Sequence, residues 1–150
     1  MISAIMHMGV TVSDLDRSIA FYRDVVGLNY LGELRMEGEA TDRLFGRPGS
    51  TARVAYLNGS TSVDAPPLEL IQFVAQDTEK QTADLFRTSI SEICFATDDI
   101  DREYERLTAL GVECISAPQP FDFTGDGFGK SKAIYFRDPD GIIMELMQAL

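Results

Sequence analysis

Two glutamates lie inside apolar segments where a charged side chain is unexpected. In an extended strand over residues 67–73, Glu69 shares one face with Ile71 and Phe73, and leucines occupy the other face. Glu145 repeats this arrangement over residues 142–148. A carboxylate held between apolar strands costs several kcal/mol unless a cation or a metal ion compensates its charge. The two glutamates therefore indicate a functional site.

His7 and Glu92 each share a strand face with small side chains, which leaves room for a ligand. The small residues are Gly9 and Thr11 beside His7, and Cys94 and Ala96 beside Glu92. A lone histidine near a chain start is more often a surface residue or a hydrogen-bonded core residue. Because His7 and Glu92 occupy equivalent positions in an internal repeat, a role in a site is favoured instead.

The repeat places residues 7–17 over residues 92–102 with a constant offset of 85. Three matched pairs are identical: Asp14 with Asp99, Asp16 with Asp101, and Arg17 with Arg102. A second constant offset, of 76, relates residues 68–72 to residues 144–148. The chain is therefore predicted to hold two copies of one unit that differ mainly by loop insertions.

Each copy must position its polar residues with the same elements. A strand leads to Asp14 or Asp99, residue types that cap a helix, and apolar residues then recur at helical spacing over 14–26 and 99–110. Gly27 and Gly111 suit the left-handed residue that ends a helix. Further strands are predicted at residues 53–57, 67–73, 133–136 and 142–148. Each unit is thus a strand, a helix, and two or three strands.

A chain of 150 residues is expected to form one domain over residues 1–150. We place the first module at about residues 1–75, a polar linker at about 76–89, and the second module at about 90–150. Residues 121–130 form a Gly-rich segment with three phenylalanines. Its composition suits a mobile cover over a pocket or an ordinary surface loop.

Charge and hydropathy exclude several partners. The chain has 13 Lys and Arg against 24 Asp and Glu, a net charge of −11, so nucleic acid and anionic membranes are not expected to bind. No apolar run approaches the ~20 residues of a membrane span, and the first ten residues do not look like a secretory signal. We expect a cytoplasmic protein. Cys94 and Cys114 fit no metal or disulfide spacing, and we expect both in the core.

Residues 7–28 and 135–146 resemble the opening and closing signatures of the vicinal oxygen chelate superfamily, and the resemblance covers nearly the whole chain. This superfamily includes glyoxalase I, methylmalonyl-CoA epimerase, fosfomycin-resistance enzymes, extradiol dioxygenases and bleomycin-binding proteins. The resemblance implies an α+β, glyoxalase-like fold in which two βαβββ modules form a cupped mixed sheet around a divalent metal ion. It also implies a homodimer, and metal ligands at His7, Glu69, Glu92 and Glu145.

Glu92 departs from the family pattern, in which most metal-binding members have histidine at this position. One imidazole and three carboxylates make a hard, anionic site that favours Mn, Mg, Co or Fe over Zn, and the identity of the metal, Ni included, stays open. Glu92 could ligate the ion, act as a base, or mark a site that has lost its metal.

The single histidine of the chain also bears on the reaction. Dioxygenase and fosfomycin-resistance members resemble each other in needing two histidines, so neither activity is expected. What remains is a glyoxalase I-like lyase or an epimerase/isomerase, which moves a proton on carbon next to a carbonyl of a small-molecule substrate. Glu145 is the preferred base, with Glu69 and Glu92 as the other catalytic candidates. Two alternatives stay open: a metal-free drug-binding or resistance protein, and an isomerase for a substrate that is neither a glutathione adduct nor a CoA thioester.

Overall fold

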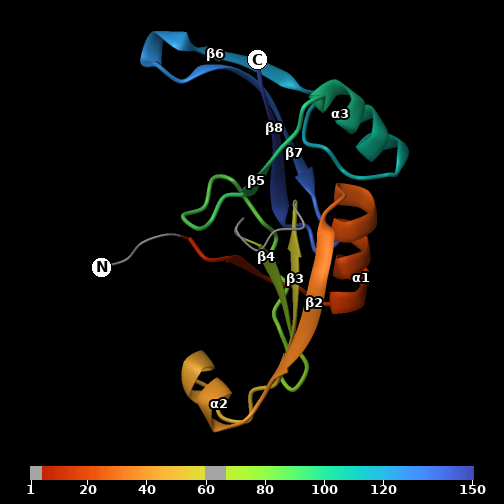
Figure 1. The fold of residues 1–150 in the computed structure, drawn as a ribbon. Helices are drawn as coiled ribbons and strands as arrows, with labels where there is room; N and C mark the ends of the chain where they lie inside the picture. Colours follow the sequence, from red (N-terminus) through yellow and green to blue (C-terminus); the bar gives the residue numbers. More distant parts are fainter. Residues whose placement is uncertain (1–4, 60–66) are drawn as a thin grey trace. The chain divides into compact units, whose positions relative to one another are not determined.

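The computed structural model describes residues 5–59 and 67–150, and the chain divides into two compact units, Met1–Lys80 and Gln81–Leu150. Each unit contains one four-stranded sheet with a helix against it (Figure 1). In this part of the chain, no helix is both long and apolar enough to cross a membrane.

The first unit consists of one sheet and two helices. Its elements are β1 (Met8–Thr11), α1 (Leu15–Ala20) continued by the π-helical η1 (Phe21–Val26), β2 (Asn29–Met36), α2 (Glu39–Phe45), β3 (Ala52–Asn58) and β4 (Leu68–Phe73). The strand order is β1-β4-β3-β2, with β1 parallel to β4 and the other pairs antiparallel. The last strand therefore lies between the first strand and the rest of the sheet.

The second unit repeats this topology. Its elements are β5 (Ile93–Ala96), α3 (Ile100–Ala109), β6 (Gln119–Phe123), the short η2 (Thr124–Asp126), β7 (Gly129–Arg137) and β8 (Ile143–Ala149). The order is β5-β8-β7-β6, again with one parallel pair, β5 and β8. The predicted α+β fold of two βαβββ units is confirmed.

The predicted helices lie where the caps place them. The Asp14 carboxylate accepts the Arg17 N–H at 3.0 Å, and the Asp99 carboxylate accepts the Arg102 N–H at 3.1 Å. The first helical segment ends at Gly27, whose φ of 92° is left-handed. Helix α2 was not predicted, because its seven residues bury only one side chain and so show no apolar periodicity.

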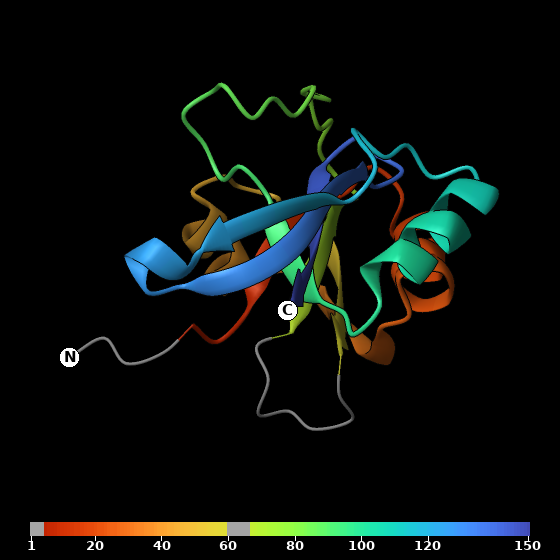
Figure 2. The same ribbon diagram turned by 90° about the horizontal axis from the view of Figure 1, so that it is seen from above.

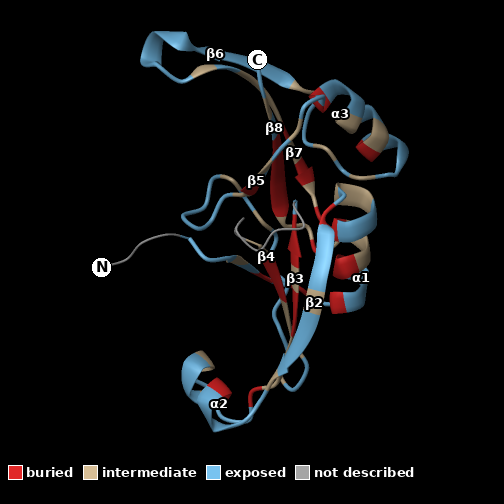
Figure 3. Ribbon diagram, in the orientation of Figure 1, coloured by how far each residue is buried: buried red, intermediate tan, exposed pale blue. Residues whose placement is uncertain are grey.

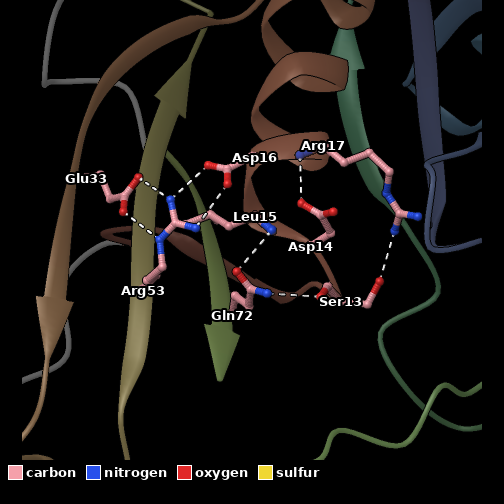
Figure 4. A network of polar contacts seen from close by, with 8 residues as sticks. All are labelled: Ser13, Asp14, Leu15, Asp16, Arg17, Glu33, Arg53 and Gln72. Atoms are coloured by element: carbon pink, nitrogen blue, oxygen red, sulfur yellow. Dashed lines mark hydrogen bonds and ion pairs between the residues drawn. The ribbon is translucent and has the colours of Figure 1, made fainter. Parts of the chain in front are cut away.

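A glutamine on the last strand of each unit holds the helix of that unit in place. The Gln72 side chain accepts the Leu15 N–H at 3.3 Å and donates to the Ser13 carbonyl at 3.1 Å (Figure 4). Gln148 makes the same two bonds, at 3.0 and 2.7 Å, to the first residue of α3 and to the loop before it. The pairing of β4 and β8 thus fixes where each helix begins.

Ion pairs tie the same helices to the next strand. Arg53 on β3 donates to the Asp16 carboxylate at 2.8 Å and to Glu33 on β2 at 2.8 Å (Figure 4). Lys132 on β7 pairs with Asp101 in the equivalent place. The hydrogen bonds and charge of Arg53 lower the pKa of Asp16 below its usual range. The internal repeat therefore includes the polar contacts as well as the backbone.

Burial is concentrated in the central strands of each sheet and on the helix faces that cover them, whereas β2 and β6 are largely exposed (Figure 3). Leu15, Tyr22, Leu57 and Leu70 are fully buried in the first unit. Helix α1 packs on β3 and β4, and α3 packs on β7 and β8. One face of each sheet is thereby left free of its own helix.

The prediction of a loop over residues 121–130 was wrong. Most of this segment belongs to a hairpin, in which Phe123 on β6 pairs with Gly129 on β7 (Figure 2). Phe121 and Phe123 stack with ring centroids 5.6 Å apart, so these two side chains lie together on the surface of β6. The glycines act in the turn, where Gly127 adopts a φ of 83°.

The glutamine bridge predicts a measurable loss of stability. Replacing Gln72 with Ala removes both bonds to the start of α1, and we expect the free energy of unfolding to fall by about 1–2 kcal/mol. Chemical denaturation followed by circular dichroism measures this difference. Gln81→Ala, at an exposed position, is the matched control and should change stability by less than about 0.5 kcal/mol. Equal stability of the two variants would refute the bridging role.

Candidate functional site

Glu69 is buried in β4, with 8 % of its surface exposed, between the buried Leu68 and Leu70. Within residues 5–59 and 67–150, its carboxylate has two polar partners. The Tyr56 hydroxyl donates to Glu69 Oε1 at 2.6 Å, and His7 Nε2 lies 3.4 Å from Glu69 Oε2. The burial predicted from the apolar pattern is therefore confirmed, and the compensating groups are a phenol and an imidazole.

The sheet register brings these groups together. Glu69 is paired with Gly9 on β1 and with Tyr56 on β3, and His7 directly precedes β1. A Cβ atom on Gly9 would lie 3.3 Å from Glu69 Oε2, closer than ordinary van der Waals contact. The small residue predicted beside His7 thus gives the carboxylate its space.

Tyr56 was not identified from the sequence. Its hydrogen bond to Glu69, and then its partial burial, raise the pKa of Tyr56 to about 12. The phenol therefore keeps its proton at neutral pH and remains a donor to the carboxylate. A tyrosine at the equivalent register position of the second unit, Tyr135, was the sequence signal that could have revealed it.

The second unit places Glu145 in the same way. Glu145 is 8 % exposed, is paired with Cys94 on β5 and with Tyr135 on β7, and Glu92 directly precedes β5. Burial raises the pKa of Tyr135, and the charges of Glu145 and Glu92 raise it further. His7 and Glu92, and likewise Glu69 and Glu145, therefore occupy equivalent positions of the two units.

The cysteines are not core residues as expected: Cys94 is exposed and Cys114 is half-buried. Along β5 the side chains alternate, so Cys94 lies on the face opposite the buried Ile93. Partial desolvation of the thiol, then a hydrogen bond with Glu145 and the charges of Glu145 and Glu92, raise the pKa of Cys94 to about 12. Cys94 thus belongs to the polar cluster of the second unit.

The four predicted ligands form two pairs of residues. His7 contacts Glu69 in the first unit, and Glu92 and Glu145 both raise the pKa of the Cys94 thiol in the second. Two donors bound to one divalent ion at 2.0–2.2 Å lie roughly 3 Å apart, so the His7 and Glu69 donors fit such an ion with little movement. Over residues 5–59 and 67–150, no group of three or more metal-binding side chains is assembled. The four-residue ligand set stays a prediction.

A cavity of about 600 Å³ opens beside His7 and Tyr56. It is lined by Met6, His7, Leu31, Gly32, Glu33, Leu34, Tyr56 and Pro67. The lining is mostly apolar, and the charge of Glu33 is already paired with Arg53. Such a cavity suits a small molecule that offers an apolar group to the leucines and a polar group to His7.

Comparison with known sequences supports a family assignment over almost the whole chain. Residues 4–146 match the Glyoxalase/Bleomycin resistance protein/Dioxygenase superfamily. The chain is 26% identical to a 2-epi-5-epi-valiolone epimerase from Actinomyces sp over 148 residues, covering 96% of this chain and 78% of the epimerase.

Two further relatives carry other names. The metallothiol transferase FosB from Lysinibacillus sphaericus (strain C3-41) is 29% identical over 140 residues, which cover 93% of this chain and 78% of that protein. A lactoylglutathione lyase from Haemophilus influenzae is 28% identical over 145 residues, which cover 96% of this chain and 91% of the lyase. The three relatives have three different activities by name, so they do not select one reaction.

Solved structures confirm the fold. A glyoxalase family protein from Bacillus cereus superposes with a TM-score of 0.84 at 24% identity, covering 100% of this chain and 96% of that protein.

The environment of Cys94 predicts that its thiol reacts slowly with an alkylating agent. Alkylation requires the thiolate, and a pKa near 12 leaves roughly 10⁻⁴ of the thiol ionised at pH 8, against about a quarter for an ordinary cysteine. In a Cys114→Ala background without metal, we expect iodoacetamide to modify Cys94 at least about tenfold more slowly than free cysteine. Glu145→Gln should accelerate the reaction, because it removes the nearby negative charge. Mass spectrometry of timed samples measures both rates, and an ordinary rate for Cys94 would contradict this description of the cluster.

Proposed function

Because the chain belongs to the glyoxalase/bleomycin resistance protein/dioxygenase superfamily, we propose that it is a divalent-metal-dependent isomerase or lyase of the glyoxalase type. The reaction is the transfer of a proton on a carbon next to a carbonyl group of a small molecule. The observation that carries the proposal is the buried Glu69 carboxylate, whose polar partners among the described residues are an imidazole nitrogen at 3.4 Å and a neutral phenol. A divalent cation would compensate its charge.

His7, Glu69, Glu92 and Glu145 are the proposed ligands. The proposal requires the pair His7 and Glu69 to share an ion with the pair Glu92 and Glu145, whether the pairs come from one chain or from two copies. One imidazole and several carboxylates suit Mn, Mg, Co or Fe, with Ni and Zn as softer candidates. When bound, the ion would supply a positive charge that stabilises the enediolate or enolate anion.

Glu145 is the preferred base, and Glu69 and Glu92 are the other candidates. The Tyr56 hydroxyl and His7 restrain the Glu69 carboxylate, whereas Glu145 has a hydrogen bond with the Cys94 thiol, a weaker donor, and no ion pair with a described side chain. A less restrained carboxylate can turn toward a substrate carbon and accept its proton. The mostly apolar cavity beside His7 and Tyr56 would hold an apolar part of the substrate.

The relatives support this class of reaction without fixing the substrate. An epimerase and a lactoylglutathione lyase are among them, at 26% and 28% identity. A metal-free protein that binds a small molecule is the second candidate. The observation that favours it is the mostly apolar cavity of about 600 Å³, which needs no ion to bind an apolar ligand.

The two candidates differ in their response to metal. In a panel of Mn²⁺, Mg²⁺, Co²⁺, Fe²⁺, Ni²⁺ and Zn²⁺, we expect at least one ion to raise the melting temperature by roughly 5–10 °C at about one hundred times its Kd. The rise should be larger at neutral than at acid pH, because the carboxylates and His7 bind metal only when deprotonated. Differential scanning fluorimetry measures the shift. If no ion acts at any pH, the metalloenzyme proposal fails and the binding-protein candidate replaces it.

Variants identify the ligands within the same measurement. Glu145→Gln, and alanine at each of the other three positions, should reduce the shift and abolish activity. Glu92→His restores the commoner ligand set of the family and should bind Zn²⁺ or Ni²⁺ more tightly than the wild type. Glu79→Gln removes an exposed carboxylate outside the proposed set and should respond as the wild type does.

A homodimer is also proposed, because sheet edges with apolar residues favour pairing of subunits. Leu31 and Leu34 on β2, and Phe121 and Phe123 on β6, are exposed large side chains on such strands. Sedimentation velocity at increasing protein concentration should show a species of twice the monomer mass. A strictly monomeric protein at the highest concentration would contradict the proposal.

A further inference from the structure

Equivalent carboxylates in the two units have different neighbours. The Tyr56 hydroxyl donates to Glu69 at 2.6 Å, whereas over the described residues Tyr135 makes no hydrogen bond to Glu145 although the register is the same. The residue on the other side differs too, since Gly9 faces Glu69 and Cys94 faces Glu145. The two carboxylates therefore differ in whether the neighbouring tyrosine donates to them and in which residue faces them from the first strand of the unit.

We infer that Tyr56 is a positioning residue that holds Glu69 as the fixed ligand of the site, a role that Tyr135 does not have toward Glu145. The inference rests on the proposed function, because it assigns Tyr56 a role toward the same divalent ion. The Tyr56 bond occupies Oε1 and leaves Oε2 as the oxygen that lies toward His7. Tyr56 thus holds one oxygen of the carboxylate, and the other faces the His7 imidazole, with which it would share a cation.

The hydroxyl of Tyr56, and not its ring, provides this restraint. A neutral phenol that donates to a carboxylate makes a short, charge-assisted bond, and such bonds orient a side chain that would otherwise rotate. The ring has a separate contact: it meets the His7 imidazole edge to face, with centroids 6.2 Å apart. Phenylalanine at position 56 keeps the ring contact and loses only the bond to Glu69.

The backbone around Glu69 is arranged for a fixed carboxylate. Gly9 leaves just enough space for Oε2, since an added Cβ would approach it to 3.3 Å. The apolar neighbours Leu68 and Leu70 are buried and hold β4 in place. The position of the strand, the bond to Oε1 and the space beside Oε2 together fix the Glu69 carboxylate. It therefore needs little rearrangement on binding a cation, and preorganised ligands bind metal more tightly.

The test compares two single hydroxyl deletions at equivalent positions. Affinities of the wild type, Tyr56→Phe and Tyr135→Phe for Mn²⁺ and for Co²⁺ are measured by isothermal titration calorimetry, with free Mn²⁺ followed by electron paramagnetic resonance. We expect Tyr56→Phe to weaken binding by roughly 10- to 100-fold, the range for removal of a partner of a metal ligand. Tyr135→Phe should weaken it by less than about threefold. Far-UV circular dichroism and the melting temperature without metal establish that both variants are folded.

Each outcome decides a specific part of the argument. If Tyr56→Phe binds both ions as tightly as the wild type, Tyr56 does not position Glu69 and the inference is wrong, while the proposed function stands. If the two variants lose affinity equally, the difference between the units is wrong. If Tyr56→Phe lowers the melting temperature without metal but leaves the metal affinity unchanged, Tyr56 stabilises the fold and does not position a ligand. If the wild type binds only another ion of the six-ion panel, the variants are compared with that ion. If it binds none of the six, the proposed function fails and this inference fails with it.

Discussion

The cost of burying a carboxylate in an apolar strand governs the arrangement of both units. An isolated charge at such a position is unfavourable by several kcal/mol, so the fold must supply partners or the group must be neutralised. For Glu69 the partners are the Tyr56 hydroxyl on β3 and the imidazole of His7, which directly precedes β1. The Tyr56 phenol brings no positive charge, so a cation beside His7 would stabilise the buried carboxylate further.

The rest of each unit serves to set the register that brings these partners together. The last strand lies between the first strand and the third, so a residue on it has two neighbours of different origin in the sequence. Gln72 and Gln148 bind the first turn of the helix that covers the same strand, and Arg53 and Lys132 bind the acidic residue in that turn. A slip of one residue would turn Glu69 toward the helix and break all these contacts.

The sequence was sufficient to predict the repeat, the helices α1 and α3 and the buried glutamates, because these depend on local caps, on period-two alternation and on constant offsets. Tyr56 was missed since its role depends on a cross-strand pair that joins residues 13 positions apart. Cys94 was misplaced because hydrophobicity alone does not say which face of β5 is covered. The hairpin over residues 121–130 was read as a loop, since its glycines outweighed its alternating phenylalanines. Convergence of the four predicted ligands would depend on contacts of longer range than any of these.

The two units differ in residues beside the carboxylates, although both keep a tyrosine there. Positions that hold the frame keep the same residue type, as in Asp14 and Asp99 or Gln72 and Gln148. Beside the carboxylates the units differ: histidine against glutamate, and glycine against cysteine. A substitution in the frame would disturb the helix cap or the register, whereas one at the open face changes only the chemistry of the carboxylate. A duplicated unit can therefore give one glutamate a fixed geometry and leave the other freer to move, on the same backbone.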